Sequence, residues 1–150
     1  MSTQLKTDSL THLTRKGTCI EFFSAYQEMD IERMLGLCNP HGEVWFKPLG
    51  EAGRGTLGEL GRTLWLLLMD CFPDLDNTVD AATAEDDEVV CRVSIFGTQR
   101  KDFAGIPSQG FRFESDHIFI FRFSPDDVIQ GITIDWNHDG FVRQLSGHAM

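Results

Sequence analysis

The sequence has no C-x-x-C motif, because its four cysteines lie far apart, at Cys19, Cys38, Cys71 and Cys91. Structural zinc sites and dithiol redox sites need closely spaced thiols, so this spacing argues against both. Each cysteine lies in an apolar context, where a free thiol behaves as a small hydrophobic residue. We therefore expect reduced thiols in a cytoplasmic protein.

Basic residues and long apolar segments are also scarce. Thirteen Lys and Arg against 23 Asp and Glu give a formal charge of −10, whereas a nucleic-acid-binding surface needs clustered cations. The longest strongly apolar run, 64–69, is too short to cross a bilayer, and the start MSTQLKTDSL has no apolar signal region. The histidines have no partners at metal-ligand spacing. We therefore expect no nucleic acid, membrane or metal partner.

The chain is rich in large side chains that can form a core. At 150 residues it suits one domain, and twelve Phe with three Trp predict dry packing or a wide apolar cavity. Helical spacing of apolar residues predicts helices over 11–29, 31–38 and 57–72. Alternating apolar residues then predict strands over 75–83, about 89–95, 111–123 and 128–138. Helices followed by antiparallel strands indicate an α+β fold.

Several stretches, in this order, resemble a known family. They are "GLCNPHGEVWF", "CFPDLDNTVDAATAEDDEVVCRVSIFGT", "FAGIPSQGFRF", "HIFIFRF" and "VIQGITIDWNHDGFVRQLS". Together, over roughly 22–146, they are similar to the SnoaL-like polyketide cyclases and ester cyclases of the nuclear transport factor 2-like superfamily. The resemblance implies one SnoaL-like domain over 1–150, with a core of about 11–146. It also implies a cone-shaped curved antiparallel sheet wrapped around three N-terminal helices, with a pocket inside.

The resemblance also implies a chemistry. Well-studied members close a polyketide ring by intramolecular aldol condensation without metal or cofactor, using an aspartate near the end of the last strand and a histidine on a neighbouring strand. Counting back from Arg-Gln-Leu at 143–145, the family's acidic position falls at Asn137 in this chain. Asp135 stands two residues earlier, on the same face of the strand. We therefore expect Asp135 to face the pocket, with His138 and Asp139 at its rim.

The partner of Asp135 depends on the register of the last hairpin. If Phe123 pairs with Val128, then Asp116 lies opposite Asp135, and two carboxylates that share an apolar site cannot both ionise cheaply. One of them is then poised as a general base. A one-residue slip would instead place His117 opposite Asp135 and form a His–Asp dyad. Both registers stay open, as does the simpler reading that these aspartates face water.

Five residues are candidates to line the pocket. Ile118 and Asn137 share the predicted face of Asp135. The large aromatic residues Trp45, Trp65 and Phe103 are compatible with a pocket wall and equally with plain core.

The predicted function is a cofactor-independent acid–base enzyme, an aldol-type cyclase of the lyase or isomerase kind, acting on a small apolar polyketide-like substrate. Two alternatives stay open: a non-catalytic binding or scaffold module, and a hydrolase or isomerase that uses the same carboxylate. The strand over 111–123 has apolar residues on both faces, so we also expect a homodimer packed through one face of the sheet.

Overall fold

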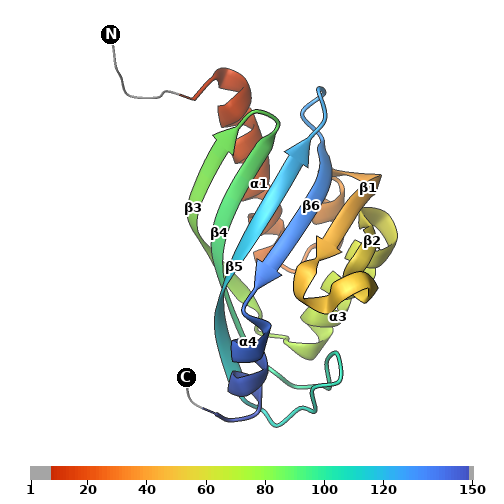
Figure 1. Ribbon diagram of the computed structural model, residues 1–150, viewed down its shortest axis with the longest axis vertical. Helices are drawn as coiled ribbons and strands as arrows, with labels where there is room; N and C mark the ends of the chain where they lie inside the picture. Colours follow the sequence, from red (N-terminus) through yellow and green to blue (C-terminus); the bar gives the residue numbers. More distant parts are fainter. Residues whose placement is uncertain (1–7, 149–150) are drawn as a thin grey trace.

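One curved sheet backed by helices forms the structure, a computed structural model that describes residues 8–148 (Figure 1). In chain order the elements are α1 (Leu10–Gln27), α2 (Ile31–Leu35), β1 (Cys38–Phe46), η1 (Lys47–Gly53), β2 (Arg54–Thr56), η2 (Leu57–Gly61), α3 (Arg62–Cys71), β3 (Asp76–Glu85), β4 (Glu88–Thr98), β5 (Arg112–Phe123), β6 (Ile129–Trp136) and α4 (His138–Leu145). The strands form an unclosed six-stranded sheet in the order β2-β1-β6-β5-β4-β3. The predicted α+β fold is confirmed. One strand pair departs from the predicted antiparallel arrangement, since β1 runs parallel to β6.

Phenylalanines on the inner face of the sheet form the core with α1, which lies behind the strands in Figure 1. Phe119 and Phe121 on β5 alternate with exposed or half-buried residues, as expected for a strand with one covered face. Phe22 and Phe23 on α1 meet them edge-to-face, with ring centroids 4.9–5.7 Å apart. Such pairs add about 0.5–1.5 kcal/mol each beyond the area that they bury.

The last hairpin has a register that neither prediction anticipated. Ile118 pairs with Asp135 and His117 with Trp136, so neither Asp116 nor His117 lies opposite Asp135. Two irregularities produce this result. Phe123 pairs with Ile129, which shifts the register by one residue from the prediction, and a bulge between Arg122 and Phe123 shifts it by one residue more. A shift of two keeps each side chain on its original face. The predicted grouping of residues by face is therefore correct for 131–136, whereas at the turn the buried residue opposite Phe123 is Ile129 and not the predicted Val128.

Arg15 fastens α1 to two turns at the same end of the sheet. Its side chain is buried and donates from Nε to Asp127 Oδ1 at 2.8 Å. It also donates to the carbonyl oxygens of Asp86 and Ser124 at 3.3 Å and 3.2 Å. Because one guanidinium satisfies both the β3–β4 and the β5–β6 turns, the helix and the sheet are held in a fixed relative position.

A fourth helix, α4, replaces the predicted end of the last strand. The side chain of Asn137 accepts a hydrogen bond from the Gly140 backbone N–H at 3.0 Å, which makes it the N-cap, so the helix begins at His138. Below the sheet in Figure 1, α4 lies near the loop that joins β4 to β5, in which Phe103 and Ile106 form an isolated bridge. These two segments add Phe141 and Phe103 to the inner face.

Candidate functional site

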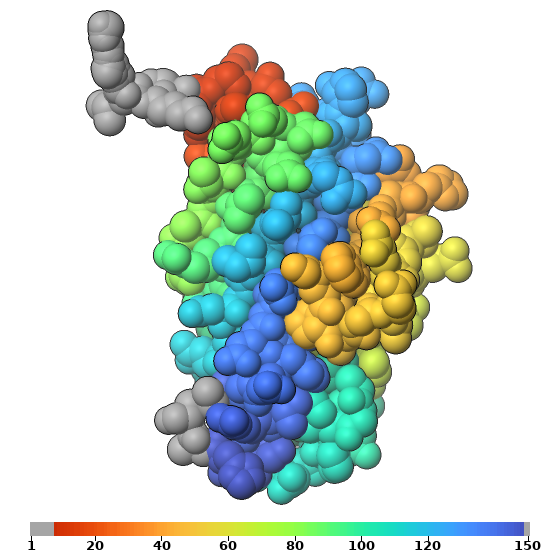
Figure 2. Space-filling view, in the orientation of Figure 1, coloured from red at the N-terminus to blue at the C-terminus, as the bar shows by residue number. Residues whose placement is uncertain are grey.

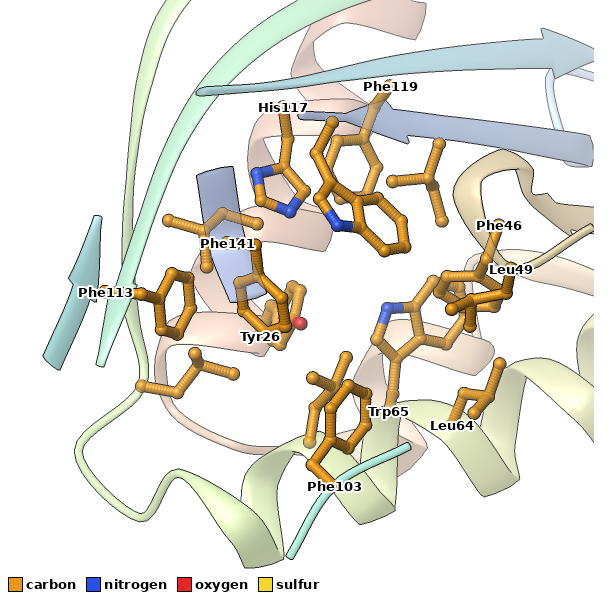
Figure 3. Close-up of a pocket in the computed structure, with 15 residues that line it drawn as sticks. Tyr26, Phe46, Leu49, Leu64, Trp65, Phe103, Phe113, His117, Phe119 and Phe141 are labelled. Carbon is orange, nitrogen blue, oxygen red and sulfur yellow. The ribbon is translucent and has the colours of Figure 1, made fainter. Parts of the chain in front are cut away.

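An apolar cavity lies between the inner face of the sheet, the helices α1 and α3, and the segments that carry Phe103 and Phe141 (Figure 3). Its lining residues are Tyr26, Phe46, Leu49, Leu64, Trp65, Leu68, Leu75, Ile95, Phe103, Phe113, His117, Phe119, Ile134, Trp136 and Phe141. The cavity volume is about 40 Å³, enough for very few waters and far below the roughly 300–1,000 Å³ of typical ligand pockets. A ligand therefore has to displace lining side chains when it binds.

The lining contains no Asp, Glu, Lys or Arg, so three neutral polar groups define its chemistry. They are the Tyr26 hydroxyl, the Trp65 indole N–H and the Nε2 atom of His117. None of the three makes a hydrogen bond with any other residue of the described range 8–148. Figure 3 shows their side chains turned towards the same central space. Within residues 8–148 the only fully enclosed side-chain N or O atom without a partner is Gln99 Oε1, so these three cavity atoms are accessible to a small polar group inside the cavity.

His117 is held in one orientation and one charge state. Its Nδ1 lies 3.3 Å from both the carbonyl oxygen and the hydroxyl of Ser115. In the tautomer whose Nδ1–H donates to that carbonyl, the Nε2 lone pair faces the cavity. Burial lowers the pKa of His117 to about 4, and the Ser115 carbonyl and the charges of Asp116 and Asp135 offset only part of this effect. The imidazole is therefore neutral at pH 7 and can accept a proton.

The other two polar groups are hydrogen-bond donors. Burial raises the pKa of the Tyr26 hydroxyl above its ordinary value, so it keeps its proton. The Trp65 indole packs edge-to-face against Tyr26 at a centroid distance of 6.5 Å, and an indole N–H can only donate. Two donors facing one acceptor can hold a carbonyl oxygen while a proton moves elsewhere on the same molecule.

Trp136 and His138, both half-buried, connect His117 to the surface through ring stacking and a hydrogen bond. The Trp136 ring stacks on His117 with centroids 5.3 Å apart and planes at 18°. Its indole N–H donates to His138 Nδ1 at 3.2 Å. The sequence alone did not lead us to predict Tyr26 or Trp136 as site residues. For Trp136 there was a signal, because it lies on the strand face that was predicted for His117.

Both predicted catalytic carboxylates lie outside the cavity, on the outer face of the sheet. The Asp135 side chain is 53% exposed, and its ion pair is a 4.0 Å contact with Lys47. Asp116 is also exposed and accepts a hydrogen bond from the Ser94 hydroxyl at 3.4 Å. The expectation that Asp135 faces the interior is wrong, because the phenylalanine-rich face is the one that the helices cover. Catalytic roles for Asp135 and Asp116 stay predictions, and the cavity gives them no contact with a ligand.

The five predicted lining residues divide in the same way. Trp65 and Phe103 line the cavity. Trp45 lies on the outer face between Lys47 and Arg54, with cation-to-ring distances of 5.6 Å and 4.8 Å. The other two lie outside the lining because Ile118 is 37% exposed and Asn137 caps α4.

No cluster of three or more His, Cys, Asp or Glu side chains that could hold a metal ion occurs within residues 8–148. No helix in that range is long and apolar enough to cross a membrane.

The comparison with known proteins identifies the family. A family model for SnoaL-like polyketide cyclases matches residues 62–145. This chain belongs to that family. No curated protein sequence matches it. Among solved structures, a candidate SnoaL-like polyketide cyclase from Jannaschia sp. CCS1 superposes with a TM-score of 0.84 at 17% identity, covering 97% of this chain and 100% of that one.

Two structures from Streptomyces are also similar. AclR, a candidate hydroxylase from Streptomyces galilaeus, has a TM-score of 0.78 at 21% identity and covers 92% of this chain and 99% of its own. TsrD from Streptomyces laurentii has a TM-score of 0.76 at 27% identity, covering 93% of this chain and 98% of its own. Similarity at these identities supports the SnoaL-like fold and leaves the reaction to be argued from the site.

Proposed function

We propose that this SnoaL-like protein is a cofactor-independent acid–base enzyme that enolises a small apolar carbonyl compound and closes a ring by an aldol step. The observation that supports the proposal is the convergence of the His117 Nε2 lone pair with two unpaired donors in an otherwise apolar cavity. His117, rather than Asp135, is the proton acceptor in this proposal.

In the proposed reaction, His117 Nε2 removes a proton from a carbon next to a carbonyl group. The electrons of that C–H bond form the enolate, whose oxygen accepts hydrogen bonds from the Tyr26 hydroxyl and the Trp65 indole. The enolate carbon then attacks a second carbonyl group of the same molecule, and a C–C bond forms. The resulting alkoxide takes the proton back from the imidazolium, so the sequence is redox-neutral and needs no co-reactant.

A low pKa is compatible with this role for His117. Burial disfavours the lone imidazolium, but an enolate formed in contact with it supplies the opposite charge. In an apolar cavity, that attraction is stronger than in bulk water. The donors opposite His117 stabilise the enolate more than the neutral ketone, which is the difference that lowers a barrier.

The lining also defines the substrate class. No cation lines the cavity, so a ligand carboxylate inside it would be left unpaired, at a large cost in free energy. The proposed substrate is therefore neutral, with at least two carbonyl groups and apolar or aromatic surface that packs against the rings.

A non-catalytic binding module of the same fold is the second candidate. The absence of any carboxylate among the cavity-lining residues within 8–148 favours it, because the aspartate of the ring-closing members has no counterpart there. In that case, the same three polar groups would only orient a ligand.

Deuterium exchange into benzoylacetone separates the two candidates. We would incubate the protein with this probe in D2O and follow loss of the methylene proton signal by NMR, comparing wild type with His117→Gln. If the protein is an enzyme, it should exchange these protons faster than buffer alone does. The catalysed exchange rate should then be about two to four orders of magnitude lower in His117→Gln. His41→Gln, which changes an exposed histidine outside the cavity lining, is the matched control.

Binding is measured in the same samples through tryptophan fluorescence, since Trp65 and Trp136 line the cavity. If wild type and His117→Gln both bind benzoylacetone and exchange it at the buffer rate, the chain is a binding module. Equal exchange above the buffer rate in both proteins would show that another group is the base.

A further inference from the structure

The half-buried members of the lining mark where a ligand could reach the cavity. They are Leu49 on η1, Leu64 and Leu68 on α3, and Trp136 at the end of β6, whereas the remaining apolar lining residues are buried. These four residues define the mouth of the cavity. Trp136 differs from the three leucines because its indole covers His117 and has a polar atom that another residue can hold.

His138 holds that atom. Its Nδ1 accepts the Trp136 indole N–H at 3.2 Å, so the remaining proton of a neutral His138 is on Nε2. The His138 ring in turn stacks on Phe141, with centroids 5.8 Å apart and planes at 27°. The order of contacts is therefore Phe141, His138, Trp136 and then His117.

The local fold explains why His138 can reach back over Trp136. Asn137 ends the strand and caps α4, so His138 is the first helical residue and the chain turns at this point. An extended strand would send residues 136 and 138 along the same face, about 6–7 Å apart along the chain, with parallel side chains. The turn instead brings the two rings into a T-shaped contact with centroids 5.9 Å apart.

We propose that His138 is a positioning residue for His117. By accepting the Trp136 N–H, it holds the indole flat on the imidazole, which restricts the imidazole to the orientation that directs Nε2 into the cavity. The same hydrogen bond keeps the indole across the mouth until a ligand displaces it. The effect on turnover rests on the proposed function, but ring order and hydrogen bonding can be measured on the protein alone.

His138→Asn and His138→Leu form the matched pair that tests this proposal. The two replacements have similar size, and both remove the ring that stacks on Phe141. Only asparagine provides an acceptor, Oδ1, at a position comparable to Nδ1. A difference between these variants therefore reports the hydrogen bond and not the lost ring contact.

The first readout is NMR on each full-length protein without ligand. Solvent exchange of the Trp136 indole proton should be slow in wild type and His138→Asn and at least about fivefold faster in His138→Leu, the worth of one hydrogen bond. The ¹⁵N signals of the His117 ring should be sharp and at the same shifts in the first two proteins, and shifted and broadened by ring motion in the third. Identical indole exchange and identical His117 shifts in the two variants would overturn the proposal.

The second readout is exchange of benzoylacetone. In His138→Leu, kcat should fall by roughly five- to tenfold with a smaller change in KM, and His138→Asn should restore it. If the NMR pattern appears but no protein exchanges the probe, the positioning role stands and the proposed enzyme function fails. If His138→Leu does not fold, Trp136→Phe provides the test, because it keeps a flat ring and removes the N–H. Unchanged His117 shifts in Trp136→Phe would overturn the proposal.

Discussion

The buried imidazole of His117 should make the fold sensitive to acid in a way that one substitution removes. Burial lowers its pKa to about 4 from an ordinary value of 6.5, so between these pH values the unfolded chain binds a proton that the folded chain does not. The stabilisation from a neutral His117 is therefore complete above about pH 6.5 and is lost as the pH falls towards 4. A pKa difference of one corresponds to about 1.4 kcal/mol, so the part of this loss that is complete by pH 4 is about 3 kcal/mol.

Urea unfolding at a series of pH values between about 7 and 4 measures this quantity. The unfolding free energy of wild type should fall by about 3 kcal/mol more than that of His117→Gln over this range, since glutamine does not titrate. Carboxylates also titrate in this range, but they are shared by both proteins and cancel in the difference. His41→Gln should follow the wild-type curve, because His41 is exposed.

Parallel curves for wild type and His117→Gln would refute the reasoning. They would mean that the folded protein protonates His117 as easily as the unfolded chain does. That result would contradict a buried imidazole and would remove the argument for a neutral Nε2 acceptor in the cavity. The test needs no substrate, so it stands apart from the question of catalysis.

Three further outcomes are expected. Tyr26→Phe should leave the unfolding free energy within about 1 kcal/mol of wild type, because the hydroxyl that it removes has no protein hydrogen-bond partner within residues 8–148, while affinity for benzoylacetone measured by fluorescence falls roughly fivefold. Asp135→Asn should change the unfolding free energy by less than about 0.5 kcal/mol in urea unfolding, since its ion pair is exposed and long; a larger change would mean that Asp135 has a buried partner. The outer face of β4 and β5, uncovered in Figure 2 and carrying Val90 and Ile118, each 37% exposed, should pack against a second copy. Light scattering should then give twice the chain mass of 16.9 kDa at micromolar concentration, and a monomer mass would exclude the homodimer.

The sequence carried enough information to predict helices α1 to α3, strands β3 to β6 in their order, and which residues of β5 share a face. Alternation of phenylalanine with polar residues on β5 is a local signal, and it grouped His117 with Phe119 and Trp136 correctly. Which face lies inside is a question of the whole fold. The family resemblance suggested that the face of Asp135 lies inside. In the structure the opposite face lies inside, because it carries the large aromatic side chains that the fold buries.

The register and the last helix were harder to predict for physical reasons. Pairing across a hairpin depends on turn geometry and bulges, and the backbone of Asp127, with φ of 64°, is a left-handed turn conformation that its sequence context did not reveal. The helix α4 is only eight residues long, so its helical period is short and its stability depends on the Asn137 cap and on packing. The pocket chemistry was missed because the wrong face of the sheet was predicted to lie inside, and a residue such as Tyr26 becomes a candidate only once the interior is known.

The three hydrogen bonds of Arg15 have a consequence for the protein as it leaves the ribosome. Asp127 follows Arg15 by 112 residues, and at about 5–20 residues per second its synthesis comes roughly 6–20 seconds later. Phe119 and Phe121, which pack against Phe22 and Phe23, are also synthesised long after them. During this interval the apolar face of α1 lacks its final partners, and exposed apolar surface of this kind makes partly folded chains prone to aggregate. The hydrogen bonds of Arg15 to the two turns form only after both turns have been synthesised.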